Sequence, residues 1–343
     1  MANAFITGFA GEQLSPAEAS FLRSAQPAGV ILFARNCVSH DQIKRLVGDA
    51  RDAVGSEDLL VLIDQEGGRV QRLRPPLGRA LPAAAAYAAL YVNEPERALA
   101  SAFSAARLLA DDLKALGINT DCAPVVDVPI PGAHDVIGDR AYGNEPLQVA
   151  ALARAVAEGF MAGGVLPVVK HIPGHGRATK DSHHDLPVVT EPHAVLSATD
   201  FAPFKALADM PSAMTAHVVF TAIDEAQPAS TSRLVTQEII RGEIGFDGLL
   251  MSDDLSMKAL TGTFANRTRA VIAAGSDLAL HCNGVLAEME EVAGAAPTLE
   301  GDGLRRFHAA LSVLGRHEPY DSVKAETQLA LVLGTDRRHA ESV

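Results

Sequence analysis

The chain has 343 residues, of which 48% are hydrophobic and 21% charged, a composition typical of a folded globular protein. Its net charge of −13 and the lack of a basic run argue against nucleic acid as a partner. The three cysteines show no CxxC spacing and cannot all pair with one another, which favours a reducing compartment and a cytoplasmic location. The chain contains no run of about 18 apolar residues, so no membrane span is predicted. The apolar segment AFITGFAG near the start is too short for a signal-peptide core.

Short apolar segments alternate with helical segments along the chain. The patterns predict eight strands, at residues 4–9, 29–33, 59–63, 118–122, 166–169, 212–217, 248–251 and 277–280. A helix is expected after Ser15, because Pro16 and Glu18 complete a capping-box signature. A long loop is expected up to about residue 93, and further helices at 39–54, 94–116, 145–161, 191–207, 236–243 and 265–274, with more helix to about 333.

Eight strand–helix units predict an α/β protein with a closed (β/α)₈ TIM barrel as a single domain. The rival fold, an open doubly wound sheet, usually has a glycine-rich first turn, and GFAGEQ after the first strand lacks the GxGxxG spacing. We expect the barrel to occupy residues 1–300. Residues 301–343 are expected to form a C-terminal helical extension that packs on the barrel.

Polar side chains stand where five of the predicted strands end. In a barrel these ends converge on one face, where the loops build the active site. Each residue alone has an ordinary explanation, as a helix cap or a structural hydrogen-bonding group. Because five strands share the feature, we expect a functional site formed by Asp64, Lys170, His171, His217, Asp253 and His281.

The segment LPVVKHIPGHGRATKDSHHDLP, residues 166–187, predicts an active-site loop. A short buried strand is followed by a stretch without hydrophobic periodicity, punctuated by Pro173, Gly174 and Gly176 and dense in titratable groups. The two glycines suggest hinges for a loop that moves over a bound substrate.

Two reaction classes fit these residues. A metal-dependent hydrolase could use the histidines of this loop together with Asp181, but the chain contains no HExxH motif and no HxH after the first strand. Glycoside hydrolysis needs a carboxylate near the anomeric carbon and a proton donor. Asp253 suits the first role, and Asp181 could orient His183 for the second, as Asp does in Ser-His-Asp triads.

Three strings, LIDQEGGRVQRL (62–73), KHIPGHGRATKDSHHDLP (170–187) and LLMSDDLSM (249–257), resemble glycoside hydrolase family 3. The resemblance is to its single-domain bacterial β-N-acetylglucosaminidases of peptidoglycan recycling, and it covers residues 3 to 295. It implies a TIM barrel, Asp253 as nucleophile, and a general acid/base dyad of Asp181 and His183 rather than His184. The adjacent Asp254 is expected to cap the segment that follows it or to hold a supporting contact.

The resemblance also implies sugar-binding roles and no cofactor or metal. The residues expected to contact the sugar are Asp64, Arg72, Arg140, Lys170 and His171. The ordinary alternative for the arginines is a surface ion pair, of Arg72 with Glu66 and of Arg140 with Asp139.

We therefore expect a retaining exo-β-N-acetylglucosaminidase of cell-wall and carbohydrate metabolism. Its expected substrates are GlcNAc-1,6-anhydroMurNAc fragments with or without a peptide, and it is expected to be a monomer or weak homo-oligomer without membrane partners. Phosphate in place of water, a β-glucoside specificity and a metal-dependent barrel hydrolase remain alternatives. A non-catalytic sugar-binding module would normally lack Asp253 or His183, and both are present.

Overall fold

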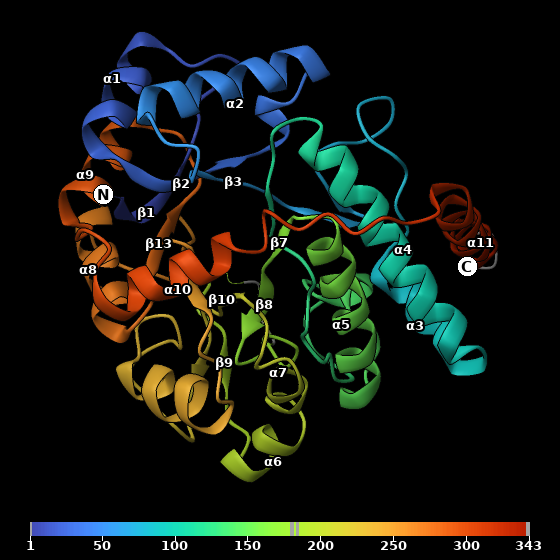
Figure 1. Cartoon of the computed structure of the whole chain (residues 1–343). Coiled ribbons are helices and arrows are strands. Elements are labelled where there is room, and N and C mark those ends of the chain that lie inside the picture. Colours follow the sequence, from blue (N-terminus) through green and yellow to red (C-terminus); the bar gives the residue numbers. More distant parts are fainter. Residues whose placement is uncertain (1, 179–181, 183–184, 341–343) are drawn as a thin grey trace.

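A computed structural model describes residues 2–178, 182 and 185–340 of the chain. Its core is a nine-stranded parallel sheet wrapped by helices (Figure 1). The strand order is β7-β6-β3-β2-β1-β13-β12-β10-β8. The bounds are β1 Asn3–Gly8, β2 Pro27–Leu32, β3 Leu60–Ile63, β6 Thr120–Asp121, β7 Leu166–Pro167, β8 Val169–Ile172, β10 Ser212–Thr215, β12 Leu249–Asp254 and β13 Leu278–His281.

The two ends of this sheet are parts of one strand, so the sheet closes. Only Val168 separates β7 from β8, and its N–H donates to the carbonyl oxygens of Asp121 and Ala123 at 2.9 and 3.0 Å. On the other side, β8 pairs with β10 in parallel register. The regular ladder of backbone hydrogen bonds is interrupted beside Pro167, which has no N–H to donate. The predicted (β/α)₈ barrel is therefore confirmed, with 166–172 as its fifth strand.

Helices cover the outside of the barrel and, in the case of α10, one of its ends. They are α1 Pro16–Ala25, α2 His40–Val54, α3 Ala84–Asn93, α4 Pro95–Lys114, α5 Pro146–Ala162, α6 His193–Ala198, α7 Ala202–Ala206, the π-helical η3 Val235–Glu243, α8 Phe264–Ala274, α9 Leu286–Ala295, α10 Gly301–Leu311 and α11 Ser322–Ala340. Short 3₁₀ turns, η1 Ala34–Asn36 and η2 Gly138–Arg140, lie in loops. In the described part of the chain, no helix is both long and apolar enough to cross a membrane.

Several helix predictions were right in position and some were wrong in extent. Ser15 caps α1 in a capping box with Glu18, as predicted. The loop expected up to residue 93 contains α3 instead, because its alanine-rich segment favours helix. The single helix expected over 191–207 is split into α6 and α7, and Pro203 stands in the first turn of α7, where a missing N–H is tolerated.

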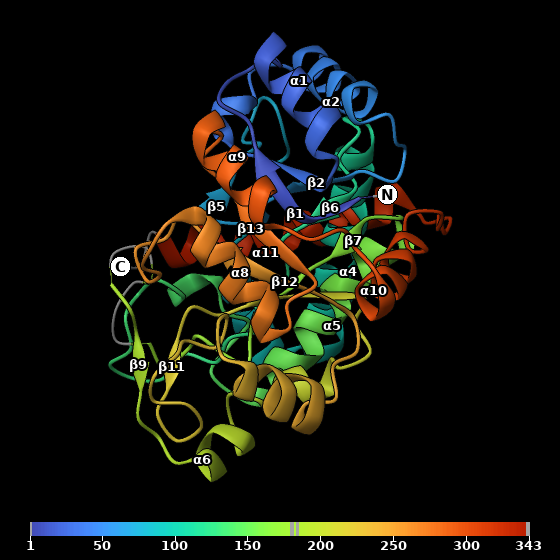
Figure 2. The ribbon, with the colours of Figure 1, turned by 90° about the vertical axis from the view of Figure 1, so that its left-hand side faces the viewer.

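Two small two-stranded sheets lie beside the barrel. Gln65–Gly67 (β4) pairs antiparallel with Val70–Gln71 (β5), directly after strand β3. Val188–Val189 (β9) pairs with Val219–Phe220 (β11), so the loops after β8 and β10 lie side by side (Figure 2). Each pair ties down a loop at the end of the barrel where the strands finish.

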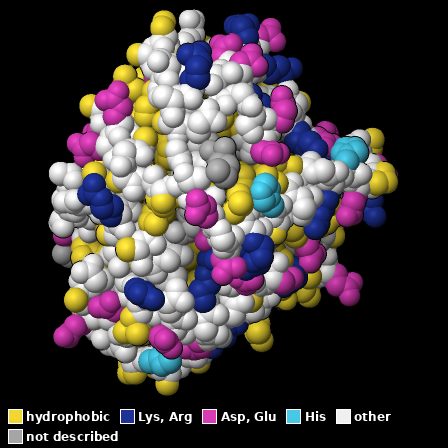
Figure 3. All heavy atoms as spheres, turned by 60° about the vertical axis from the view of Figure 1, so that its left-hand side comes forward, with side chains coloured by type: hydrophobic (Ala, Val, Ile, Leu, Met, Phe, Trp, Pro, Cys, Tyr) yellow, Lys and Arg dark blue, Asp and Glu magenta, His cyan; other side chains and the backbone are white. Residues whose placement is uncertain are grey.

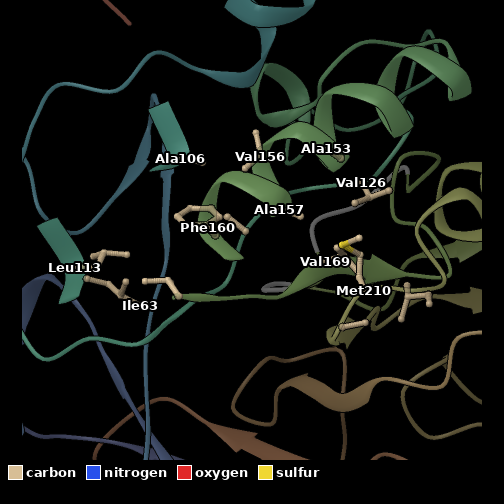
Figure 4. Packing of buried hydrophobic residues seen from close by; sticks show 14 of the residues in the cluster. Ile63, Ala106, Leu113, Val126, Ala153, Val156, Ala157, Phe160, Val169 and Met210 are labelled. Carbon is tan, nitrogen blue, oxygen red and sulfur yellow. The ribbon is translucent and has the colours of Figure 1, made fainter. Parts of the chain in front are cut away.

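Side-chain alternation divides the barrel core into two layers. Outward residues such as Ile63 and Val169 belong to the buried cluster that includes residues of α4 and α5, and Figure 4 shows Ile63 beside Leu113 and Val169 beside Met210. Inward residues such as Ile6, Leu62 and Met251 form the barrel interior. This alternation is what the period of two in a strand requires.

Helix α10 closes the bottom of the barrel. Its Phe307 and Ala310, followed by Val313, belong to the same buried cluster as the inward strand residues. Helix α11 packs on α3 and α4, burying Ala325, Leu329 and Val332. These contacts show that both helices pack against the rest of the barrel domain. The division into a barrel of residues 1–300 and an extension of residues 301–343 stays a prediction.

We expect Phe307→Ala to destabilise the protein by about 3–5 kcal/mol, since it removes a buried ring that α10 packs against the inward residues of the barrel. Chemical denaturation followed by circular dichroism measures this. The control is His308→Ala, one residue along the helix on its exposed side, where a change within about 0.5 kcal/mol is expected. Equal small effects of both substitutions would show that α10 does not contribute to the barrel core.

Candidate active site

A cavity of about 260 Å³ opens at the carboxyl end of the barrel strands. Of the eight residues expected to have catalytic or sugar-binding roles, six line it: Asp64, Arg72, Arg140, Lys170, His171 and Asp253. The other two, Asp181 and His183, lie outside the described residues. Ser182, the residue between them in sequence, also lines the cavity.

The cavity floor is built from a chain of alternating charges. Arg72 Nη2 donates to Asp64 Oδ2 at 2.9 Å, and Lys170 Nζ donates to Asp64 Oδ1 at 2.9 Å. Lys170 Nζ also lies 2.6 Å from Glu66 Oε1, and Arg140 binds both oxygens of Glu66 at 2.8 Å. The order is therefore Arg72, Asp64, Lys170, Glu66, Arg140, so that each carboxylate lies between two cations.

This arrangement keeps the buried groups ionised. Burial alone would raise the pKa of the Asp64 carboxyl, but Lys170 and then Arg72 outweigh it and hold the pKa below its ordinary value. The same balance, with Lys170 and Arg140 as the cations, lowers the pKa of Glu66 to about 2. Burial would lower the pKa of Lys170, yet Asp64 and Glu66 raise it. At neutral pH the floor thus offers fixed donors and fixed acceptors.

The fifth strand ends in a second buried cluster. His171 Nδ1 lies 2.7 Å from Asp127 Oδ2, and the backbone N–H of His175 donates to Asp127 Oδ1 at 2.7 Å. The ring of His175 contacts Ser182, with Nε2 3.1 Å from Oγ. Burial, and then the neighbouring His171, lower the pKa of His175 to about 4, so this ring is neutral at neutral pH.

Asp253 and Asp254 occupy the last two positions of β12, which continues past the predicted end at Met251 because Asp254 still pairs with Leu280. Asp253 Oδ1 accepts the N–H of Asp254 at 2.8 Å. Asp254 Oδ1 accepts the N–H groups of Ser256 and Cys282 at 3.0 and 3.1 Å. Asp254 therefore holds the turn after the strand, the role expected for it from the sequence.

Two polar strand ends do not reach the cavity wall. His217 hydrogen-bonds Ser230 Oγ at 2.7 Å and the carbonyl oxygen of Asp254 at 3.1 Å. His281 is buried against the ring of Phe264 and lies 2.9 Å from Glu288 Oε2. Neither is among the described residues that line the cavity, so a place for them in the site stays a prediction.

The ion pairs suggested as ordinary alternatives for the arginines are also wrong. Arg72 pairs with Asp64 instead of Glu66, and Arg140 pairs with Glu66 instead of Asp139. Asp139 pairs with Arg69 at 3.0 Å. Gly176, where a hinge was expected, packs closely against the backbone of Val128. A Cβ at this position would lie 2.0 Å from the carbonyl oxygen of Val128.

Three residues of the site were missed in the sequence. Glu66 lies in the string that carries Asp64, and its position two residues along could have suggested that it faces the same cavity. Phe33, at the end of β2, puts its ring in the cavity wall, with the Arg72 guanidinium 4.9 Å from the ring centre. Asp127 is fully buried behind His171, and no periodic signal marks it.

The charged groups in the floor of the cavity pair with one another. Within the described ranges, no group of three or more His, Cys, Asp or Glu side chains could hold a metal ion. On the face shown in Figure 3, acidic and basic side chains are interspersed over the surface.

Comparison with known proteins identifies the family. The glycosyl hydrolase family 3 N-terminal domain matches residues 7–305. The chain is 38% identical to a β-hexosaminidase of Bordetella avium over 93% of this chain and 91% of that one. It is 41% identical to a β-hexosaminidase of Alkalilimnicola ehrlichii over 80% and 79% of the two chains.

Solved structures agree. NagZ from Neisseria gonorrhoeae, in complex with N-trifluoroacetyl-D-glucosamine, is 30% identical and superposes with a TM-score of 0.85 over 98% of each chain. With the family domain matched over most of its length and the barrel shared, the chain belongs to glycosyl hydrolase family 3.

Proposed function

We propose that this glycoside hydrolase is a retaining exo-β-N-acetylglucosaminidase that removes the non-reducing GlcNAc from GlcNAc-1,6-anhydroMurNAc fragments, with or without a peptide. The observation that carries the proposal is the cavity whose wall Asp253 shares with the charge chain of Asp64, Lys170, Glu66 and Arg140. Support also comes from the relatives, which are named β-hexosaminidases, and from the N-acylated glucosamine held by the gonococcal NagZ.

The size and polarity of the cavity suit one terminal sugar. Its volume of about 260 Å³ lies below the range of about 300–1,000 Å³ typical of pockets for drug-sized ligands. Fixed carboxylates can accept from sugar hydroxyls, while Lys170 and the arginines can only donate. A site with both kinds of group in fixed places can recognise the hydroxyl pattern of a single ring, as exo cleavage requires.

In the proposed mechanism, Asp253 attacks the anomeric carbon while the bond to the leaving oxygen breaks. His183, oriented by Asp181, gives its proton to that oxygen, and a glycosyl ester forms on Asp253. His183 then takes a proton from water as the water attacks the anomeric carbon and releases Asp253. Phosphate as the acceptor would follow the same course without the need for that proton. A cytoplasmic location and a monomeric or weakly homo-oligomeric state remain predictions.

The first test is turnover of p-nitrophenyl β-N-acetylglucosaminide beside the β-glucoside. We expect a preference for the N-acetyl sugar of more than about 100-fold, because a site that bonds a polar group rejects the analogue that lacks it. The same activity is expected in EDTA and with phosphate omitted. A preference for the glucoside would keep the fold and overturn the substrate, and loss of activity in EDTA would favour the metal-dependent alternative.

Asp253→Ala should lower kcat by at least about 10³-fold, because it removes the group that forms the covalent intermediate. Azide should restore part of the activity and yield the α-glycosyl azide, since it enters the space left by the carboxylate. Asp254→Ala is the matched control, in which azide should restore nothing. If azide rescued the Asp254 variant instead, the nucleophile would be the neighbouring residue.

His183→Ala should slow a natural disaccharide far more than an aryl glycoside with a good leaving group, because only the former needs full protonation of the leaving oxygen. The measurement is kcat/KM for both substrates. His184→Ala serves as the adjacent control and should leave their ratio unchanged. Equal slowing of both substrates in the His183 variant would argue against the acid/base role.

A further inference from the structure

Asp127 lies directly behind the cavity wall and makes three hydrogen bonds with the end of the fifth strand. Its side chain is completely buried. Oδ1 accepts the backbone N–H of His175 at 2.7 Å and that of His171 at 3.3 Å, and Oδ2 lies 2.7 Å from His171 Nδ1. The two backbone donors hold Oδ1, so the carboxylate is oriented with Oδ2 toward the imidazole.

This contact decides which nitrogen of His171 carries the proton. A neutral imidazole has one N–H, and a carboxylate can only accept. Burial alone would raise the pKa of Asp127, but the contact with His171 and then the hydrogen bond from the backbone N–H of His175 lower it. The carboxylate therefore stays ionised and holds the proton on His171 Nδ1, which leaves Nε2 as a hydrogen-bond acceptor on the opposite side of the ring.

That acceptor completes the set of groups in the wall. His171 lines the cavity next to Lys170, whose ammonium can only donate. A sugar hydroxyl placed between them accepts from the ammonium and donates its single proton to the imidazole. With the other tautomer, the ring and the ammonium would both donate to that hydroxyl, and neither would accept its own O–H proton.

We propose that Asp127 is a positioning residue that fixes His171 as its Nδ1–H tautomer, so that Nε2 accepts a hydrogen bond from a hydroxyl of the sugar bound in the cavity. The inference rests on the proposed function for the identity of the ligand. The tautomer itself does not depend on that function and is measured separately.

Asp127→Asn tests the proposal with a nearly isosteric change. The amide oxygen keeps the two backbone donors, so the NH₂ group turns to His171 Nδ1 and the ring must accept there. The proton then moves to Nε2, which becomes a donor facing the cavity. We expect kcat/KM to fall about 10- to 100-fold, by the same factor for an aryl glycoside and a disaccharide, because leaving-group protonation is unchanged.

The direct readout is the ¹⁵N NMR spectrum of the histidine rings at about pH 8.5, with the His171 signals assigned by their loss in His171→Gln. Wild type should show His171 protonated at Nδ1 only, and Asp127→Asn should show it protonated at Nε2. Binding of N-acetylglucosamine, measured by calorimetry, should weaken with the loss of kcat/KM. A purely structural role for Asp127 would not invert the tautomer.

Asp121→Asn is the matched control. Asp121 is also completely buried and ends the fourth strand, where Oδ1 accepts the N–H of Gln65 at 3.0 Å. Burial raises its pKa to about 8, so that the carboxyl is largely neutral at pH 7 and an amide replaces it closely. We expect kcat/KM of this variant to stay within about threefold of wild type.

The outcomes separate this proposal from the proposed function. A wild-type His171 protonated at Nε2 or at both nitrogens overturns the proposal, as does an unchanged kcat/KM in an Asp127→Asn variant whose tautomer has inverted. If wild type cleaves none of the glycosides, the proposed function fails. The tautomer and the binding of N-acetylglucosamine then still decide the role of Asp127. If Asp127→Asn does not fold, the wild-type spectrum alone can still contradict the proposed role.

Discussion

The site depends on the burial of one ammonium group. The Lys170 side chain is 3% exposed, and a buried cation of this kind is tolerated only when carboxylates surround it. Asp64 and Glu66 meet that need, and each of them requires a further cation, which Arg72 and Arg140 supply. Removing any member would take one of its charge partners from each neighbour, so the five residues act as one unit. A rigid unit of this sort keeps donors and acceptors in fixed places before a sugar arrives.

Barrel closure brings this unit together. Asp64 follows β3, Lys170 belongs to β8, and Arg140 lies in the loop after β6, far apart in sequence but at one end of the same sheet. Because the fifth strand pairs with β6 through β7 and with β10 through β8, both sides of the ring meet at the segment that carries Lys170 and His171. Asp253 arrives on β12, two strands further round. Parallel strands thus deliver all of these groups to one face.

The sequence pointed to the polar residues at the ends of strands. It did not point to Asp127, the buried residue that holds His171. Asp64, Lys170 and Asp253 break apolar runs, and a polar residue in that place is visible without a structure. His217 and His281 also follow apolar runs, but they contact Ser230 and Glu288. A side chain at a strand end can face a neighbouring loop as well as the cavity. Asp127 gives no signal at all, since its importance lies in a contact 44 residues away.

The sequence by itself determined the strand–helix alternation, the capping box of the first helix and the positions of the ionisable strand ends, because each depends on neighbours within a few residues. The resemblance of three short strings also named the family that comparison confirmed. Only the tertiary structure decided which charges pair. Arg140 reaches Glu66 across 74 positions while its sequence neighbour Asp139 turns to Arg69. Pairing is set by distance and burial in the folded barrel, and neither is encoded in local spacing.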